Sequence, residues 1–222
     1  FGLLLQQIGF LVAIGSCLGI VMERTGAMTS IGSKIINSFG TSKTLIAMSM
    51  IGVVVGIPVF CDSGFIILSR LIPALTSPEI NQAQLSLALS SGLYASHTLV
   101  PPTPGPLAAA ANLGMSANLG LVILIGLIGA LPAALVAFWM SKKLGVKIHA
   151  DHTMHVAPGQ SEHNTILMFL PLVLPILLIS CATLPKIIPG LQALTNFFKI
   201  VGNPAVALFI GLLCAFLLIS KK

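Results

Sequence analysis

The stretch HTLVPPTPGP, residues 97–106, interrupts an otherwise apolar segment that extends over residues 83–112. Proline has no amide hydrogen for the helical ladder, and it also restricts the residue before it. Four prolines fall within this stretch: Pro101, Pro102, Pro104 and Pro106. We therefore predict a helix that unwinds here and resumes at Pro106. Unwound backbone at membrane depth is tolerated where it lines protein or a water-filled cavity, and such breaks form binding sites in secondary transporters.

A second interruption lies earlier in the chain, within residues 44–75. The apolar run that starts at Thr44 is broken by GIPVFCDSG (residues 56–64) and continues as FIILSRLIPAL (residues 65–75). Each arm has about 14 residues, or roughly 20 Å at the helical rise, which is shorter than the ~30 Å hydrocarbon core of a bilayer. We predict a re-entrant hairpin rather than two full spans.

The composition is that of a membrane protein. Hydrophobic residues make up 56% of the 222 residues and charged residues 7%, whereas soluble domains carry about a quarter charged residues. Four further apolar segments are predicted to be ordinary transmembrane helices: about 3–22, 119–140, 166–183 and 203–220. The predicted fold class is all-α, a polytopic membrane protein that forms one transmembrane transport domain over residues 1–222. A polar loop at about 141–165 and a shorter link at 184–202 connect the later helices.

The charge distribution predicts the orientation in the membrane. The net charge is +6, and the lysines and arginines lie mostly between apolar segments, which indicates the positive-inside rule rather than nucleic-acid binding. Three basic clusters share one face, which we expect to be cytoplasmic: Arg24, Lys34 and Lys43; Lys142, Lys143 and Lys147; Lys221 and Lys222. The loop at 141–165 then lies in the cytoplasm, and Lys186 and Lys199 lie on the opposite face.

The sequence indicates neither a signal peptide, nor a disulfide framework, nor a metal site. It begins at Phe1 within an apolar run that lacks a charged region and a cleavage site, so we expect an internal fragment of a longer carrier. Four cysteines without metal-ligand spacing are expected to be free thiols: Cys17, Cys61, Cys181 and Cys214. Four loop histidines fit a solvated loop better than a metal site: His149, His152, His155 and His163. We expect no cofactor, and we expect a proton gradient to be the energy source.

Asp62 is the one acidic residue embedded in an apolar stretch, and an intramembrane carboxylate is costly enough to suggest a function. It could bind the substrate and carry a proton; alternatively, Asp62 or Ser63 could cap the second arm of the hairpin. Arg70 is interpreted as an anchor at the membrane interface, with a clamp for a substrate carboxylate as the alternative. His97 precedes the proline-rich break and could handle substrate or protons, or be a buried structural histidine.

The chain around the two breaks also offers hydroxyl groups and free amides. Thr98, Thr103 and Gly105 supply hydroxyls and accessible backbone at the second break, where a new helix would present free amides to an anion. The hairpin arm that begins near Ser63 and Gly64 offers another such end. Because two helix N-termini could together hold one carboxylate, these residues join the acidic and histidine candidates as predicted substrate ligands.

The chain contains two motifs, GIPVFCDSGFIIL (residues 56–68) and GLYASHTLVPPTPGPLAAA (residues 92–110). They resemble those of the gluconate permease family of gluconate:proton symporters, within the ion-transporter superfamily. Members of that family have an acidic residue in a similar hairpin and a His-x-x-x-Pro-Pro-x-Pro-Gly-Pro break. The gluconate carriers tend to have Glu after an aromatic residue at the place where this chain has Asp62 after Cys61.

The resemblance implies two inverted repeats, each with a re-entrant hairpin and a broken helix, of which this chain holds mainly the first. It also implies a multi-pass protein of the bacterial inner membrane, embedded in lipid and compatible with a homo-oligomer, that takes up gluconate or a related hydroxy acid with protons. Carriers of other small carboxylates or of D-serine are alternatives. Outside the transporters, the rivals are a channel and a membrane-embedded hydrolase; the sequence has neither an HExxH nor a GxSxG signature for the latter.

Overall fold

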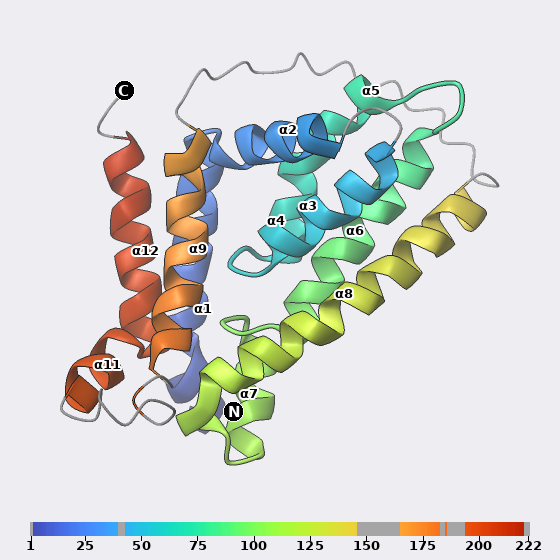
Figure 1. Ribbon diagram of the computed structural model, residues 1–222. Coiled ribbons are helices and arrows are strands. Elements are labelled where there is room, and N and C mark those ends of the chain that lie inside the picture. Colours follow the sequence, from blue (N-terminus) through green and yellow to red (C-terminus); the bar gives the residue numbers. More distant parts are fainter. Residues whose placement is uncertain (1, 40–42, 146–164, 183–184, 186–193, 220–222) are drawn as a thin grey trace.

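The computed structural model describes residues 2–39, 43–145, 165–182, 185 and 194–219, and Figure 1 shows how their helices are arranged. An isolated bridge between Ser77 and Ile80 is the only β-type pairing in this part of the chain. The predicted all-α class is therefore confirmed, and its apolar helices fit a membrane protein.

The first two helices are α1 (Gly2–Arg24) and α2 (Ala27–Phe39), which meet at a bend of 71°. Gly26 lies at the bend with φ of 71°, a left-handed conformation that glycine adopts without strain and that commonly ends a helix. α2 buries an apolar stripe and exposes the opposite, polar face: Ala27, Met28 and Ile31 are buried, whereas Ser33 and Lys34 are exposed. In Figure 1 this amphipathic helix lies across one end of the molecule.

The first predicted interruption is present. α3 (Thr44–Gly56) is followed by a non-helical break at residues 57–60, after which the chain continues as α4 (Cys61–Leu68). The 3-10 turn η2 (Ser69–Leu71) then connects α4 to the short helix α5 (Ile72–Leu75). Figure 1 shows the chain turning at this break and returning toward the end where α2 lies. The break is shorter than expected, because the second half of the predicted interruption is helical. That the two arms form a re-entrant hairpin stays a prediction.

The second predicted interruption is also present. α6 (Gln82–Leu99) and α7 (Pro104–Asn112) are separated by residues 100–103. α7 starts at Pro104 and not at Pro106 as predicted. The difference arises because the first turn of a helix needs no amide hydrogens, so it accepts both prolines.

After the 3-10 turn η3 (Ser116–Asn118), α8 (Leu119–Leu144) extends for 26 residues, past the predicted end at residue 140. The polar loop therefore begins at Gly145 rather than at residue 141, and its four histidines lie outside the described residues. The C-terminal helices are α9 (Thr165–Cys181), α11 (Thr195–Val201) and α12 (Pro204–Ile219). Figure 1 shows α9 and α12 beside α1.

Glycines bring the backbones of α3, α6 and α8 into close contact. A Cβ atom on Gly92 of α6 would clash with the carbonyl oxygen of Ser49 in α3, and one on Gly126 of α8 would clash with the carbonyl oxygen of Leu99. Because the obstacles are backbone atoms, only glycine permits this approach. The Ser49 hydroxyl also donates to the carbonyl of Ala134 in α8, at 3.2 Å.

A capping box at the start of α6 also ties this helix to the end of α8. The Asn81 side-chain oxygen accepts from the Gln84 amide at 2.8 Å, and the Gln84 side-chain oxygen accepts from the Asn81 amide at 3.0 Å. The other ends of these side chains reach α8: Asn81 Nδ2 donates to the Gly145 carbonyl at 2.9 Å and Gln84 Nε2 to the Lys142 carbonyl at 3.2 Å. Two side-chain bonds therefore join α6 to α8 at this end.

Within the described chain, α8 is the one helix that is long and apolar enough to cross a membrane by itself. If the bent pairs α1–α2 and α11–α12 are each counted as one span, the number of possible spans rises to three. The segment predicted as a span at 119–140 is therefore supported. α3 and the described part of α9 are shorter apolar helices.

The described basic residues are grouped along the helices as the charge pattern predicts, whereas Lys147, Lys186, Lys221 and Lys222 lie outside the described residues and the cytoplasmic side stays a prediction. In Figure 1, α1 and α8 end on the side where α2 lies, whereas α11 lies on the other side. Arg24, Lys34 and Lys142 belong to the first group and Lys199 to α11. At the end of α8, the Lys143 ammonium lies 3.8 Å from the ring centre of Trp139, a pairing suited to a membrane interface.

Candidate functional site

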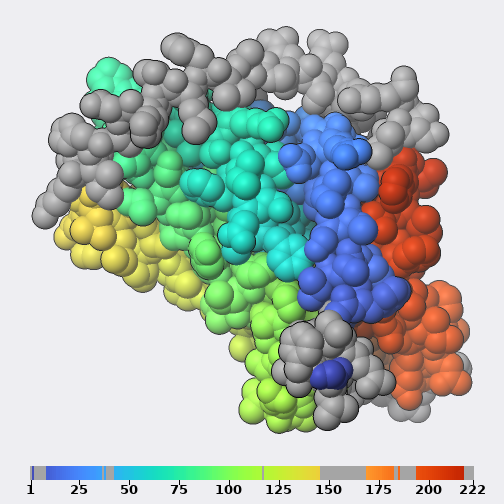
Figure 2. Space-filling view, turned by 180° about the vertical axis from the view of Figure 1, so that it is seen from behind, coloured from blue at the N-terminus to red at the C-terminus, as the bar shows by residue number. Residues whose placement is uncertain are grey.

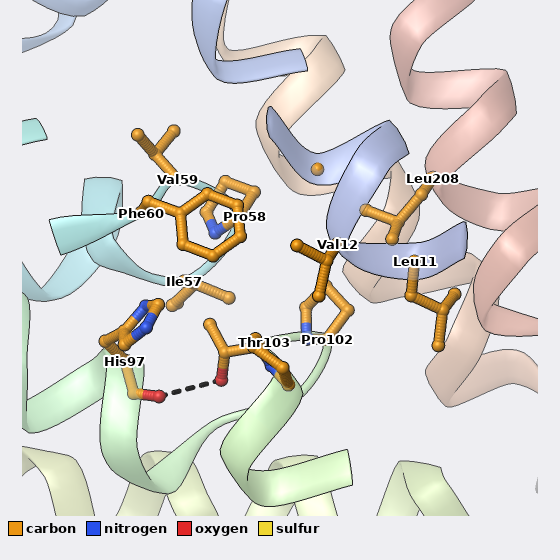
Figure 3. A pocket seen from close by; sticks show the side chains of 12 residues that line it. Leu11, Val12, Ile57, Pro58, Val59, Phe60, His97, Pro102, Thr103 and Leu208 are labelled. Carbon is orange, nitrogen blue, oxygen red and sulfur yellow. Dashed lines mark hydrogen bonds between the residues drawn. The ribbon is translucent and has the colours of Figure 1, made fainter. Parts of the chain in front are cut away.

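The breaks of the two interrupted helices meet at a small cavity, which we call the break cavity (Figure 3). Residues 57–60 form one wall, and His97, Pro102, Thr103 and Pro104 form another. Two other helices complete the lining: α1 through Leu11, Val12 and Gly15, and α12 through Leu208. The volume of ≈ 20 Å³ is room for about one water molecule. The break cavity is therefore closed to larger solutes in this conformation.

The prolines leave carbonyl groups at the end of α6 without their helical donors. The carbonyl of His97 would accept from residue 101 and that of Val100 from residue 104, but both positions are proline. The Thr103 hydroxyl lies 2.8 Å from the His97 oxygen and 2.7 Å from the Val100 oxygen, so it donates to one of them at a time. Figure 3 draws the first of these bonds. The Thr103 hydroxyl, a predicted substrate ligand, is thus engaged with the backbone of the break.

The His97 side chain is half-buried at the break cavity. Its ring centre lies 5.7 Å from that of Phe60, with the ring planes inclined by 54°. The Nδ1 atom is buried and has no hydrogen-bond partner among the described residues. Because an unpaired buried polar atom is costly, this nitrogen is suited to meet a proton, a water molecule or a ligand.

Asp62 lies in a different and larger cavity, between α4 and α6. This α4–α6 cavity has a volume of ≈ 320 Å³ and is lined by Cys61, Asp62, Phe65, Ile66, Ser90, Leu93 and Tyr94. Its volume falls at the lower end of the range of ligand pockets, about 300–1,000 Å³. The Asp62 side chain is exposed, and its Oδ1 accepts a weak hydrogen bond from Cys61 Sγ at 3.7 Å. The structure thus places Asp62 and His97 in separate cavities.

The alternative of Asp62 or Ser63 as a helix cap is wrong. Phe60 occupies the N-cap position, α4 begins at Cys61, and no side chain bonds the cap amides. Asp62 and Ser63 lie inside the first helical turn, where a carboxylate interacts favourably with the helix dipole. The error arose because small and acidic residues are common both at caps and in first turns.

Two of the predicted ligands flank Asp62 on α4 without lining either cavity. Ser63 is exposed. The Gly64 amide, predicted to be free for an anion, donates to the carbonyl of Phe60 at 2.9 Å. A Cβ atom on Gly64 would lie 3.0 Å from a methyl carbon of Leu93, so this glycine serves the packing of α4 on α6.

The remaining predicted ligands, Thr98 and Gly105, line neither cavity. Thr98 is exposed on α6, and its hydroxyl donates to the carbonyl of Tyr94 at 2.7 Å. Gly105 is exposed in the first turn of α7, and a Cβ atom there would meet nothing within 4 Å. The structure therefore brings together the breaks themselves, but it does not gather all predicted ligands around one point.

Two residues of the α4–α6 cavity, Ser90 and Tyr94, are absent from the predicted ligands. With His97 they recur at i, i+4 and i+7, a spacing that places them along one face of α6. Tyr94 is the one tyrosine of the chain. Polar side chains at this spacing in an apolar helix are the sequence signal that identifies them.

Lysine and arginine are absent from the described lining of both cavities. Arg70 is exposed in η2, beyond the end of α4, and it reaches neither cavity. No group of three or more His, Cys, Asp or Glu residues that could hold a metal ion occurs in the described part of the chain. The four loop histidines fall outside it.

A model of the family described as GntP family permease matches residues 1–222. The chain belongs to the GntP permease family. This confirms the resemblance found in the two motifs, to a family whose curated relatives are named as permeases and transporters rather than enzymes.

Curated relatives of this GntP-family chain are permeases of bacteria. It is 28% identical to the inner membrane permease YgbN of Escherichia coli K12, over 100% of the chain and 52% of that protein. It is 29% identical to the Gnt-II system L-idonate transporter of the same strain, over 100% of the chain and 52% of that protein. A gluconate permease of Pseudomonas aeruginosa is 31% identical over 97% of the chain and 50% of that protein. The chain spans about half the length of these relatives, and no solved structure matches it significantly.

Proposed function

We propose that this chain is part of a secondary active transporter that takes up gluconate or a related sugar acid, together with protons, across the bacterial inner membrane. The observation that carries the proposal is the family match along the whole chain. Two relatives are named as a gluconate permease and an L-idonate transporter, and both of those substrates are sugar acids. The two opposed helix breaks support it, because discontinuous helices form substrate sites in secondary transporters.

Proton coupling follows from the charge of the substrate. An anion that enters a cell with a negative interior moves against about 2.3 kcal/mol per charge for each 100 mV of membrane potential. One proton per monoanion cancels that charge, and additional protons make uptake electrogenic. Accumulation of a sugar acid therefore requires coupling to an ion gradient.

Asp62 is the proposed proton carrier and His97 the second candidate. A substrate carboxylate near an ionised Asp62 would be repelled, so the proton and the anion favour each other's binding. The unwound backbone of residues 97–106 is the proposed cradle for the carboxylate. The first turn of α7 offers it the Gly105 amide, since Pro104 and Pro106 have no amide hydrogen and the Leu107 amide donates to the Thr103 carbonyl. Residues beyond this chain are expected to complete the site.

Uptake by the full-length carrier in proteoliposomes tests the proposal. Labelled gluconate, L-idonate, small hydroxy acids and D-serine are offered with an imposed inward proton gradient. We expect a sugar acid to accumulate above its equilibrium level, to stay chemically unaltered, and to leak out when a protonophore collapses the gradient. Equilibration without accumulation would indicate a channel, and an altered product would indicate a hydrolase.

A further inference from the structure

We infer that the sugar-acid substrate binds in the α4–α6 cavity through its hydroxyl groups, and that Ser90 and Tyr94, beside Asp62, determine which substrate is accepted. The inference rests on the proposed function, which supplies the sugar acid. It adds a location, an orientation and two residues that are absent from the ligands predicted from the sequence.

The two cavities differ in volume, and this difference favours the α4–α6 cavity as the substrate site. The break cavity, at ≈ 20 Å³, holds about one water molecule. The α4–α6 cavity, at ≈ 320 Å³, has the size of a small-ligand pocket. By volume alone, the second can therefore hold a six-carbon acid, whereas the first would have to open.

The lining of the α4–α6 cavity suits a polyhydroxylated chain. Phe65, Ile66 and Leu93 supply apolar surface for the carbon backbone. Asp62 supplies an acceptor, and the hydroxyls of Ser90 and Tyr94 can both donate and accept.

Each polar group keeps hydrogen-bonding capacity for a ligand beyond its contacts within the chain, although the Tyr94 hydroxyl and the Asp62 carboxylate both lie within hydrogen-bonding reach of the Cys61 thiol. The Ser90 hydroxyl donates to the Leu87 carbonyl at 3.2 Å, which leaves its lone pairs for a substrate hydroxyl. Asp62 and Tyr94 are exposed, Tyr94 to 54%. A few polar groups on an apolar wall are what fixes orientation in small-molecule sites.

Charge sets the orientation of the substrate. Since the described lining of the α4–α6 cavity holds the Asp62 carboxylate and neither lysine nor arginine, it favours hydroxyls over the substrate carboxylate. His97 lies one helical turn beyond Tyr94 on the same face of α6, at the break cavity. The carboxylate is therefore directed toward His97 and the breaks, and the hydroxylated end toward Ser90.

The first test measures recognition of single hydroxyl groups. The full-length carrier takes up labelled gluconate in competition with analogues that each lack one hydroxyl. We expect at least one analogue to compete about tenfold less well than gluconate, since a site built to bond a hydroxyl rejects a ligand without it. Tyr94→Phe should lower the apparent affinity for gluconate about tenfold but leave the apparent affinity for that analogue unchanged. Ser90→Ala should do the same for a different hydroxyl.

Ser91→Ala is the matched control. The Ser91 hydroxyl bonds the backbone of its own helix and lies outside the described lining of the α4–α6 cavity, so this variant should behave as wild type. If Ser90 or Tyr94 has a purely structural role, its variant should lower the apparent affinity for gluconate and for all analogues by the same factor. That result would overturn the inference.

The second test needs no transport. In a full-length carrier whose single cysteine is Cys61, gluconate should slow modification of the thiol by a small reagent severalfold, and Tyr94→Phe should require about tenfold more gluconate for the same protection. A carrier whose single cysteine is Cys17, exposed on α1 and outside this cavity, should show no protection.

The outcomes separate this inference from the proposed function. Protection of Cys61 by gluconate without gradient-driven uptake would support the site and contradict the transport proposal. Gradient-driven uptake without protection, and with the same analogue preference in wild type and both variants, would overturn the site. In that case a lipid chain or another segment of the carrier fills the α4–α6 cavity.

Discussion

At the scale of single residues, Thr103 shows how a broken helix is made stable. One buried hydroxyl serves two carbonyls whose helical donors have been replaced by proline. The Asp62 side chain, in contrast, is exposed, and the buried Nδ1 of His97 has no hydrogen-bond partner in the described chain. The first residue maintains the shape of the break, and the other two are available for chemistry.

The role of Thr103 predicts a loss of stability in Thr103→Val. This variant keeps the volume but leaves both carbonyls without a donor, so we expect a decrease of about 1–3 kcal/mol in the free energy of unfolding. Thermal unfolding of the full-length carrier in detergent measures it. Thr103→Ser should recover most of the loss. Thr98→Val, which removes an exposed hydroxyl near the end of α6, should have a small effect; equal losses in both valine variants would contradict the assignment.

The role of Asp62 predicts a loss of coupling in Asp62→Asn. The amide keeps the size of the side chain but carries no titratable proton, so gradient-driven accumulation of gluconate should be nearly abolished while exchange of internal for external gluconate persists. Proteoliposome uptake measures both processes. Glu79→Gln, at an exposed acidic residue before α6, should accumulate gluconate normally. Accumulation retained in Asp62→Asn would remove Asp62 as the proton carrier.

At the scale of elements, the two breaks were predictable and their exact bounds were not. Clustered prolines exclude a regular helix, and GIPVFCDSG interrupts an apolar run, so the existence of both breaks is local information. The bounds differ because the first turn of a helix accepts proline, aspartate and glycine. Both breaks therefore end earlier than predicted, at Cys61 and at Pro104.

The contact between α8 and the end of α6 can be tested with two glycines three residues apart. A Cβ atom on Gly126 would clash with the carbonyl of Leu99, whereas one on Gly129 would lie 3.7 Å from the Leu99 side chain, an ordinary contact. We expect Gly126→Ala to destabilise the carrier by about 1–3 kcal/mol and Gly129→Ala to leave it unchanged or slightly more stable. Thermal unfolding in detergent compares them, and equal unfolding temperatures would contradict the packing described.

At the scale of the whole molecule, the separation of Asp62 from His97 could not be predicted. The spacing of Ser90, Tyr94 and His97 defines one face of α6 from sequence alone. Which neighbour covers that face depends on how α4 packs, and this contact involves Gly64 and Leu93 from distant parts of the chain. Such long-range packing has no local signature, so Asp62 could be identified as a candidate from sequence, whereas the α6 residues that share its cavity could not.

The orientation in the membrane gives a prediction at this scale. In a cysteine-free full-length carrier, Lys199→Cys should react with an impermeant thiol reagent in intact cells, because α11 lies on the side opposite the basic clusters. Lys143→Cys, at the end of α8, should react only in inside-out vesicles. Reaction of both positions from the same side would refute this topology.

α6 is fastened to α8 at both of its ends, by Asn81 and Gln84 at its start and by the approach of Gly126 to Leu99 at its finish. The α6 wall of the α4–α6 cavity is thus attached to α8 at both ends. In Figure 2, the cyan atoms of the hairpin region lie on the face seen from behind, with green atoms of the α6 region beside them. We therefore expect the cavity to widen through a movement of α4, which residues 57–60 connect to α3.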